Sequence, residues 1–280
     1  MTVTSAKGIN ACPVISQEEV ARGIFLMRLR APEIAAAVLP GQFVNIQVHA
    51  QSAGQISPLL RRPFSVCQVD RAEGSIAILW KIVGQGTRIL ASHCPGAVLS
   101  VIGPLGNGYQ LPTNVARLAI VAGGLGIAPM PLLAVFLQQR GFAFDALLGA
   151  RTKAELWGEN ELSACGGRVT CATDDGSAGQ HGFVTDLLQN WLQRSEETPA
   201  RRIFACGPMP MLQRVAEICR RANVVAQVAI ETIMGCGFGI CMGCNTEPAE
   251  GVQNAGRYLL ACIDGPVFES NKIRYESVAH

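Results

Sequence analysis

The sequence has little charge and few aromatic side chains, which argues against several classes of protein. Aromatic residues make up 6% and charged residues 16% of the 280 residues, and the formal net charge is only +2. Nucleic-acid binding relies on concentrated positive charge, so this composition argues against it. With only four histidines, no convincing Ser-His-Asp or Cys-His arrangement is present. The sequence therefore favours neither a nucleic-acid-binding protein nor an enzyme with a catalytic triad.

Signals for export and for membrane insertion are also weak. Residues 1–14 lack the apolar core of a secretory signal, so we expect a cytoplasmic protein. Residues 118–137 carry no charge and are long enough to cross a membrane. Three glycines and two prolines interrupt this segment, which instead predicts a buried strand, a glycine turn and a helix. In a reducing compartment the eleven cysteines would stay free or bind metal.

Four of the cysteines form a pattern near the C-terminal end. Cys236, Cys241, Cys244 and Cys262 follow the spacing C-x4-C-x2-C-x17-C. This is the plant-type iron–sulfur spacing, in which one loop supplies three thiolates and a fourth comes from elsewhere. Glycines beside and between the first three cysteines allow tight turns and let backbone N–H groups approach the sulfurs. The pattern predicts a 2Fe-2S cluster.

The same four cysteines are compatible with three alternatives. A structural zinc site is one, although zinc sites favour two C-x2-C-like pairs and only one such pair is present. Disulfides would require an oxidising compartment. The cysteines could also cluster by chance and bind no metal. The spacing and the glycine content favour the cluster over all three.

Residues from about 10 to 112 read as short strands between glycine turns, which predicts an antiparallel barrel or sandwich. Three segments in this half are candidates for ligand binding. Residues 61–65 offer arginines that could clamp a diphosphate, and residues 81–87 offer glycine N–H groups and a threonine hydroxyl. Residues 103–109 form a turn-rich loop that could close over a ligand. Each alone fits an ordinary turn, so their co-occurrence is the stronger signal.

From about residue 115 the chain alternates strands and helices, which predicts a parallel, doubly wound sheet with ligands at the carboxyl ends of its strands. Residues 123–129 join the first strand to the first helix, whose N-terminus could receive a pyrophosphate, although the spacing is not G-x-G-x-x-G. Residues 206–209 place a thiol and a glycine at another strand end, where Cys206 could equally be a small buried residue. Asp174 and Asp175 read as a turn.

Taken in order, the motifs RRPFS, KIVGQGT, GGLGIAP and CGPMPML and the final cysteines resemble the ferredoxin–NADP reductase superfamily. The GCGFGICMGC loop and the CIDGPVF segment resemble the electron-transfer subunits of type B dihydroorotate dehydrogenase in particular. The resemblance implies a multidomain α+β fold. An antiparallel β-barrel FAD domain is expected at residues 1–113, a Rossmann-like parallel α/β NAD domain at 114–226, and a small C-terminal 2Fe-2S domain at 227–280.

The resemblance also implies how the cofactors are held and used, with no catalytic acid or base on this chain. Arg62, Pro63, Phe64, Ser65, Ile82, Val83, Gly86 and Thr87 are expected to bind FAD, Gly124, Gly126, Cys206 and Gly207 to bind NAD, and Cys236, Cys241, Cys244 and Cys262 to bind the cluster. In that family, electrons pass from dihydroorotate to FMN in a separate catalytic subunit, then through the cluster and FAD to NAD, in pyrimidine (UMP) biosynthesis. The expected partner is this FMN-containing dihydroorotate dehydrogenase subunit, in a heterotetramer of two of each chain.

Other functions stay open on the sequence alone. The chain could be an NAD(P)H–ferredoxin reductase-type subunit of another redox complex, transhydrogenase-like or sulfide dehydrogenase-like. It could also be a zinc-stabilised interaction domain on an inactive reductase scaffold. NADP is an alternative to NAD, because Arg151 and Lys153 follow the second strand and could bind a 2′-phosphate. The preference for NAD rests on the resemblance alone.

Overall fold

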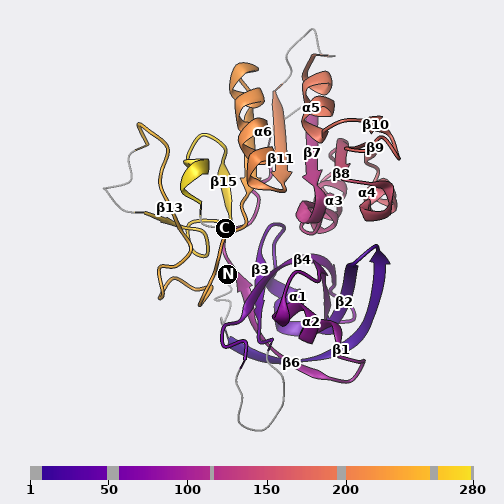
Figure 1. Cartoon of the computed structure of the whole chain (residues 1–280), viewed down its shortest axis with the longest axis vertical. Coiled ribbons are helices and arrows are strands. Elements are labelled where there is room, and N and C mark those ends of the chain that lie inside the picture. Colours follow the sequence, from indigo (N-terminus) through magenta and orange to yellow (C-terminus); the bar gives the residue numbers. More distant parts are fainter. Residues whose placement is uncertain (1–7, 49–56, 114–116, 194–199, 253–257, 279–280) are drawn as a thin grey trace.

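The computed structural model describes residues 8–48, 57–113, 117–193, 200–252 and 258–278. Residues 1–7, which are part of the stretch behind the export prediction, lie outside this range. Figure 1 shows three parts: a barrel, an α/β layer packed against it, and a C-terminal segment of loops beside both. This arrangement confirms the predicted fold class.

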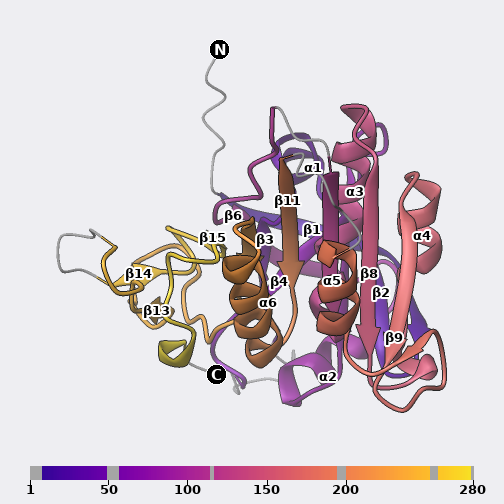
Figure 2. The same cartoon turned by 90° about the horizontal axis from the view of Figure 1, so that it is seen from above.

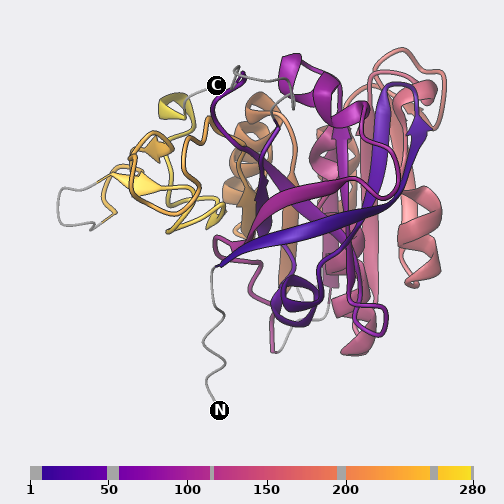
Figure 3. The ribbon, with the colours of Figure 1, turned by 90° about the horizontal axis from the view of Figure 1, so that it is seen from below.

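The first part is a closed antiparallel barrel in the order β1-β2-β5-β4-β3-β6. Its strands are β1 (Gly8–Ala21), β2 (Ile24–Arg30), β3 (Phe43–Ile46), β4 (Arg62–Asp70), β5 (Ser75–Lys81) and β6 (Val98–Leu105), with short helices α1 (Pro32–Ala37) and α2 (Gln85–Ala91) between them. The long indigo strand β1 runs along the outside in Figure 3 and pairs with both β2 and β6. Buried aliphatic side chains fill the interior, and closure removes unpaired strand edges.

The second part is a seven-stranded sheet in the order β10-β9-β8-β7-β11-β12-β15. Its strands are β7 (Arg117–Gly123), β8 (Phe144–Ala150), β9 (Arg168–Thr173), β10 (Gln180–His181), β11 (Arg201–Cys206), β12 (Val225–Ala229) and β15 (Val267–Glu269), and all pairs are parallel except β12 with β15. The strand order reverses between β7 and β11. In an open α/β sheet, that reversal places a ligand crevice at the carboxyl ends of the strands on either side of it.

Helices cover both faces of this sheet, as Figure 2 shows. Helices α3 (Met130–Gln139) and α4 (Glu159–Ala164) pack on one face, and α5 (Val184–Gln193) and α6 (Met209–Arg221) on the other, because their buried side chains belong to two separate core clusters. Two single turns, η1 (Gly124–Ile127) and η2 (Lys153–Glu155), follow β7 and β8. In the part of the chain that the structure describes, no helix has the length and apolarity needed to cross a membrane.

The C-terminal segment is attached to both other parts. It contains the hairpin of β13 (Asn245–Thr246) and β14 (Leu259–Leu260) and the turn η3 (Tyr275–Ser277). Its strand β15 extends the sheet by pairing with β12. The two boundaries between the three predicted domains stay predictions, since the last segment shares a sheet with the second.

Candidate functional site

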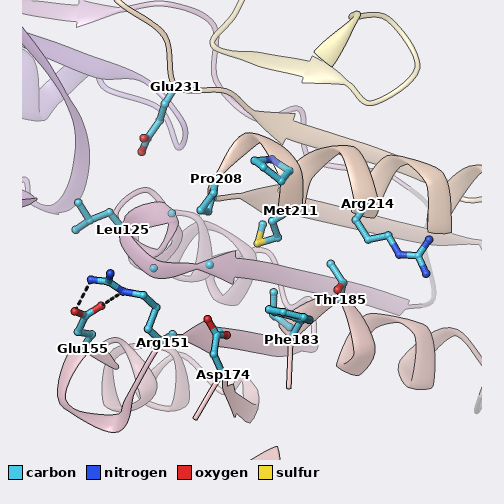
Figure 4. A pocket seen from close by; sticks show the side chains of 18 of the residues that line it. Leu125, Arg151, Glu155, Asp174, Phe183, Thr185, Pro208, Met211, Arg214 and Glu231 are labelled. Carbon is cyan, nitrogen blue, oxygen red and sulfur yellow. Dashed lines mark hydrogen bonds and ion pairs between the residues drawn. The ribbon is translucent and has the colours of Figure 1, made fainter. Parts of the chain in front are cut away.

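A first cleft opens at the carboxyl ends of β7, β8, β9 and β11, with a volume of about 570 Å³ (Figure 4). The predicted NAD residues Gly124, Gly126 and Gly207 line it. Gly124 has a φ of +53°, which favours glycine. At Gly126 an added Cβ would lie 2.1 Å from the carbonyl oxygen of Cys206, so any side chain there would collide with the end of β11. These glycines let the turn after β7 pack closely on the end of β11, and a turn of this kind at a helix N-terminus can bind a pyrophosphate.

Charged side chains from two parts of the fold meet at the edge of this cleft. Arg151 makes two bonds to Glu155, with Nε–Oε2 at 3.1 Å and Nη2–Oε1 at 2.7 Å. Lys81 of the barrel reaches the same carboxylate at 3.1 Å. The hydrogen bond from Arg151 lowers the pKa of Glu155 below its ordinary value. Lys153, the other predicted 2′-phosphate ligand, is not among the residues that line the cleft.

A second cleft of about 430 Å³ lies between the barrel and the sheet. Seven of the eight predicted FAD residues line it: Arg62, Pro63, Phe64, Ser65, Val83, Gly86 and Thr87. Ile82, which follows the last residue of β5, does not line it. The Thr87 hydroxyl accepts from the N–H groups of Val83 and Gly84, and so also stabilises the start of α2.

The groups around the second cleft fit a flavin dinucleotide. Trp80 lines the cleft, and its indole N–H is buried without a partner among the described residues. Of the two arginines in the RRPFS motif, Arg61 is already committed to the barrel, since it donates to the carbonyl and hydroxyl oxygens of Ser100 at 2.7 and 2.8 Å. Arg62 lines the cleft, so it is the arginine available for a diphosphate.

The two clefts adjoin. Lys81, Leu125 and Glu231 line both of them, while Cys206 lines the second and Gly207 the first. Burial, and then the nearby carboxylate of Glu231, raise the pKa of Cys206 well above its ordinary value, so the thiol stays neutral. A ligand in one cleft can therefore contact a ligand in the other beside Cys206.

Several lining residues were not identified from the sequence. Glu155, Trp80 and Glu231 lie in no motif, and Glu231 joins the cleft only because it follows the carboxyl end of β12. The signal available for Glu231 in the sequence was the general rule that ligands bind at the carboxyl ends of the strands in an α/β sheet. Asp174 also lines the first cleft, although its sequence indicated only a turn. That turn is present, since the Asp175 carboxylate accepts from the backbone N–H and the hydroxyl of Ser177.

The structure brings the four predicted cysteine ligands together as two pairs. In the first, the N–H groups of Cys236 and Cys241 each donate to the other's sulfur at 3.4 Å. In the second, the sulfurs of Cys244 and Cys262 lie 3.2 Å apart and are buried. Gly239, from the loop that joins Cys236 to Cys241, donates its N–H to the sulfur of Cys262, so the pairs are neighbours.

The local environment suits thiolates on the loop. Burial pushes the pKa of Cys236 upward, but backbone N–H groups of Cys241, Phe238 and Ile240 donate to its sulfur and lower the pKa to about 6. Burial and the contact with Cys244 raise the pKa of Cys262 to about 12 in the absence of a cation. Among the described residues, no three His, Cys, Asp or Glu side chains converge as ligands of a single metal ion would. The two neighbouring pairs supply four thiolates, which is the ligand set of an iron–sulfur cluster.

Comparison with known proteins agrees with this geometry. Residues 231–274 match the family described as the iron–sulfur cluster binding domain of dihydroorotate dehydrogenase B, and residues 11–109 match the oxidoreductase FAD-binding domain. The chain is 38% identical over 262 residues to the dihydroorotate dehydrogenase B (NAD(+)) electron transfer subunit of Bacillus caldolyticus, covering 93% of this chain and 96% of that protein. The corresponding subunit of Desulforamulus reducens is 34% identical over 263 residues, covering 94% and 97%.

Solved structures show the same architecture. The structure of an NADH-dependent reduced ferredoxin–NADP oxidoreductase superposes with a TM-score of 0.83 at 28% identity, covering 97% of this chain and 92% of that one. The cytochrome b5 reductase domain of Ulva prolifera nitrate reductase, at 19% identity and a TM-score of 0.64, shares the fold over 78% of this chain and 94% of that one. The sequence identity to the curated relatives, together with the match of the cluster-binding domain, shows the family. The chain belongs to the family of electron transfer subunits of dihydroorotate dehydrogenase B.

Proposed function

We propose that this chain carries electrons from an FMN-containing, dihydroorotate-oxidising catalytic subunit to NAD, through a 2Fe-2S cluster and FAD. The observation that carries this proposal is the contact between consecutive sites. Met234 and Pro266, which belong to the two arms bearing Cys236 and Cys262, both line the second cleft. The second cleft in turn adjoins the first through Lys81, Leu125 and Glu231. The three sites thus form one continuous series.

The order of the sites matches the number of electrons that each group handles. When bound, an iron–sulfur cluster exchanges one electron, nicotinamide exchanges a hydride, and a flavin between them can do both. The chain's own residues bind and orient these groups. Arg62 and the α2 turn are suited to the FAD phosphates, and the glycine turn after β7 is suited to the NAD pyrophosphate.

The choice of NAD over NADP is supported by the charges of the first cleft. Glu155 forms ion pairs with Arg151 and Lys81, which are two of the cations that line the cleft. Asp174 adds another carboxylate to the lining. A 2′-phosphate would meet these carboxylates before it met a free cation, whereas a 2′-hydroxyl can donate to a carboxylate.

We assign the partner-binding face to exposed apolar side chains around the cysteine loop, here called the cluster patch: Leu59, Leu60, Ile233, Phe238, Ile240, Met242 and Ile263. Leu60 and Ile263 lie against the loop, because a Cβ added at Gly235 or Gly239 would meet them at 4.0 and 2.7 Å. Such patches are typical of protein interfaces, and single-electron exchange requires the cluster to lie close to the partner's flavin. The occupant is the catalytic subunit, and the proposed assembly is a cytoplasmic heterotetramer of two of each chain.

The decisive experiment is to purify the chain anaerobically and to measure its iron, acid-labile sulfide, zinc and flavin. We expect two irons and two sulfides per chain together with FAD. The isolated chain should oxidise NADH with an artificial acceptor and should not oxidise dihydroorotate. Material that contains zinc in place of iron and sulfide, or that turns over dihydroorotate without a partner, would overturn the proposal.

A second candidate is a reductase-type subunit of another redox complex. The likeness to the NADH-dependent reduced ferredoxin–NADP oxidoreductase structure, at 28% identity over 97% of this chain, is the observation that favours it. Co-purification separates the two functions. Recovery of an FMN-containing subunit that oxidises dihydroorotate supports the first candidate, and reduction of ferredoxin by the complex without dihydroorotate oxidation supports the second.

A further inference from the structure

One buried polar side chain links the barrel to the cysteine loop. Asn45 lies on β3, is 0% exposed, and donates from Nδ2 to the carbonyl oxygen of Cys236 at 2.7 Å. The partners are 191 residues apart in the sequence. Gly237, with a φ of +85°, makes this approach possible, because an added Cβ there would lie 2.7 Å from Asn45 Nδ2. The loop is thus shaped to receive this amide.

Barrel stability does not explain why an asparagine occupies this position. Its Oδ1 is buried and has no partner among the described residues. An unpartnered buried amide oxygen opposes folding, and an aliphatic side chain of the same size would suit the surrounding core better. The bond to the Cys236 carbonyl is therefore the interaction that distinguishes asparagine from leucine here.

Strand β3 also belongs to the second cleft. Phe43 lines that cleft, and β3 pairs with β4 so that Phe43 faces Ser65 and Asn45 faces Pro63, both of which line the cleft. The strand that forms one wall of the proposed flavin site is therefore the same strand that holds the cysteine loop. A displacement of the loop from β3 would change the separation between the two redox sites.

A second asparagine makes the equivalent contact with the other arm. Asn107, in the loop after β6, donates from Nδ2 to the carbonyl oxygens of Ile263 at 2.8 Å and Asp264 at 3.2 Å. Its backbone N–H also donates to the carbonyl of Gly265 at 2.6 Å. Ile263 follows Cys262 directly in the chain. The turn-rich segment 103–109, a candidate for closing over a ligand on its sequence, thus contacts the arm that bears the fourth cysteine.

We propose that Asn45 and Asn107 are positioning residues that fix the two arms of the cluster site to the flavin barrel. Asn45 holds the arm of Cys236, and Asn107 holds the arm of Cys262. Together they set the placement of the cluster relative to the flavin and protect it from loss. This inference rests on the proposed 2Fe-2S cluster, since without metal the two bonds would only join loops.

The variants that test it are Asn45→Leu, which keeps the side-chain size and removes the donor, and Asn107→Ala, which truncates an exposed side chain and leaves its backbone bond in place. Because Asn107 is on the surface, its variant should fold even if the barrel does not tolerate Asn45→Leu. Gln17→Met is the matched control. It removes a hydrogen bond from Gln17 Nε2 to the carbonyl oxygen of Ala91 inside the same barrel, and Gln17, like Asn45, has a buried amide oxygen without a partner among the described residues.

Three readouts are compared with the wild-type protein: the electron paramagnetic resonance spectrum of the reduced cluster, the rate of iron loss to a chelator, and the flavin content. Both asparagine variants should lose iron about tenfold faster or more, as is typical when partners of metal ligands are removed, and should show shifted g-values with flavin retained. Gln17→Met should match the wild type. Variants of both asparagines with wild-type spectra and iron loss would overturn the inference, whereas wild-type protein without iron and sulfide would overturn the proposed function itself.

Discussion

At the scale of single residues, Glu155 is the side chain that most affects the charge of the first cleft. It binds Arg151 through two hydrogen bonds and Lys81 through a third contact, and Figure 4 shows the Arg151–Glu155 pair at the edge of the cleft. Arg151 is largely exposed, so the contribution of the pair to folding is small. We propose a larger effect on ligand choice, because Glu155 neutralises Arg151. Arg151 lines the cleft and is the basic side chain suggested for a 2′-phosphate.

We predict that Glu155→Gln shifts the chain towards NADPH. The change removes the charge that compensates Arg151 and Lys81, so the ratio of kcat/KM for NADPH to that for NADH should rise by about tenfold, equivalent to about 1.4 kcal/mol. Steady-state oxidation of both nucleotides with an artificial acceptor measures this ratio. Because the bond to Arg151 lowers the pKa of Glu155, the wild-type carboxylate stays ionised at neutral pH, and its selectivity should not vary there.

Glu247→Gln is the control for that experiment, since it breaks a similar exposed pair with Arg274 in the C-terminal segment. Its nucleotide selectivity should equal that of the wild type. If Glu155→Gln also keeps the wild-type ratio, the carboxylate has no part in excluding a 2′-phosphate.

At the scale of secondary-structure elements, the close packing of the turn η1 on the end of β11 shapes both clefts. We predict that Gly126→Ala disrupts this contact, because its Cβ would lie 2.1 Å from the carbonyl oxygen of Cys206 and the backbone cannot yield cheaply. Overpacking of this kind costs about 1–3 kcal/mol. The KM for NADH should rise and the thermal midpoint should fall, as measured by initial rates and by calorimetry. Unchanged values of both would show that the turn and β11 can separate without consequence.

The sequence predicted most of these elements, because their patterns are local. The apolar run before Gly123 and the helix that follows are found as β7 and α3, and the short alternating strands of the first part close into the expected barrel. Strand β15 was not predicted, since three residues carry too little periodicity and its partner β12 is distant in the chain. The hydrogen bond between Asn45 and Cys236 could not be predicted either, because the pattern of a strand does not show which distant loop the strand will contact.

The candidate site was predictable to a similar extent. Motifs with small or reactive residues gave the cysteines and the two glycine turns, and all four cysteines do come together. Single residues outside any motif, such as Trp80 and Glu231, became part of the clefts only when the barrel was placed against the sheet. Ile82 belongs to a motif that was recognised, but its side chain does not line the cleft. It follows the last residue of β5, and the motif does not show which way a side chain beyond the strand end points.

At the scale of the whole molecule, the cluster patch and the nucleotide cleft have no residue in common. The cysteine loop lies beside the barrel and the β12–β15 edge of the sheet, whereas the first cleft lies at the ends of β7, β8 and β9 (Figures 1 and 2). A partner could therefore cover the patch while NAD enters and leaves freely. Partner binding and NADH oxidation should then be separable by mutation.

We predict that Ile240→Glu prevents assembly with the dihydroorotate-oxidising subunit without abolishing NADH oxidation. Ile240 is 76% exposed within the cluster patch, so a carboxylate there does not disturb the core but would be buried unpaired in an interface. Interface residues of this kind commonly contribute about 2 kcal/mol or more, which is a loss in affinity of roughly 30-fold. Binding to the partner subunit is measured by titration, and NADH oxidation with an artificial acceptor is measured in parallel.

Because Ile240 precedes a cluster ligand, iron content must be checked, and Leu60→Glu provides a second variant that lies outside the cysteine loop. Val98→Glu is the matched control, since Val98 is a comparably exposed apolar residue on the barrel strand β6 and is not part of the patch. We expect both patch variants to lose the partner and Val98→Glu to retain it. If both patch variants bind the partner with wild-type affinity, electrons must enter through another face, and a cluster exposed on this side would then have no partner to exchange them with.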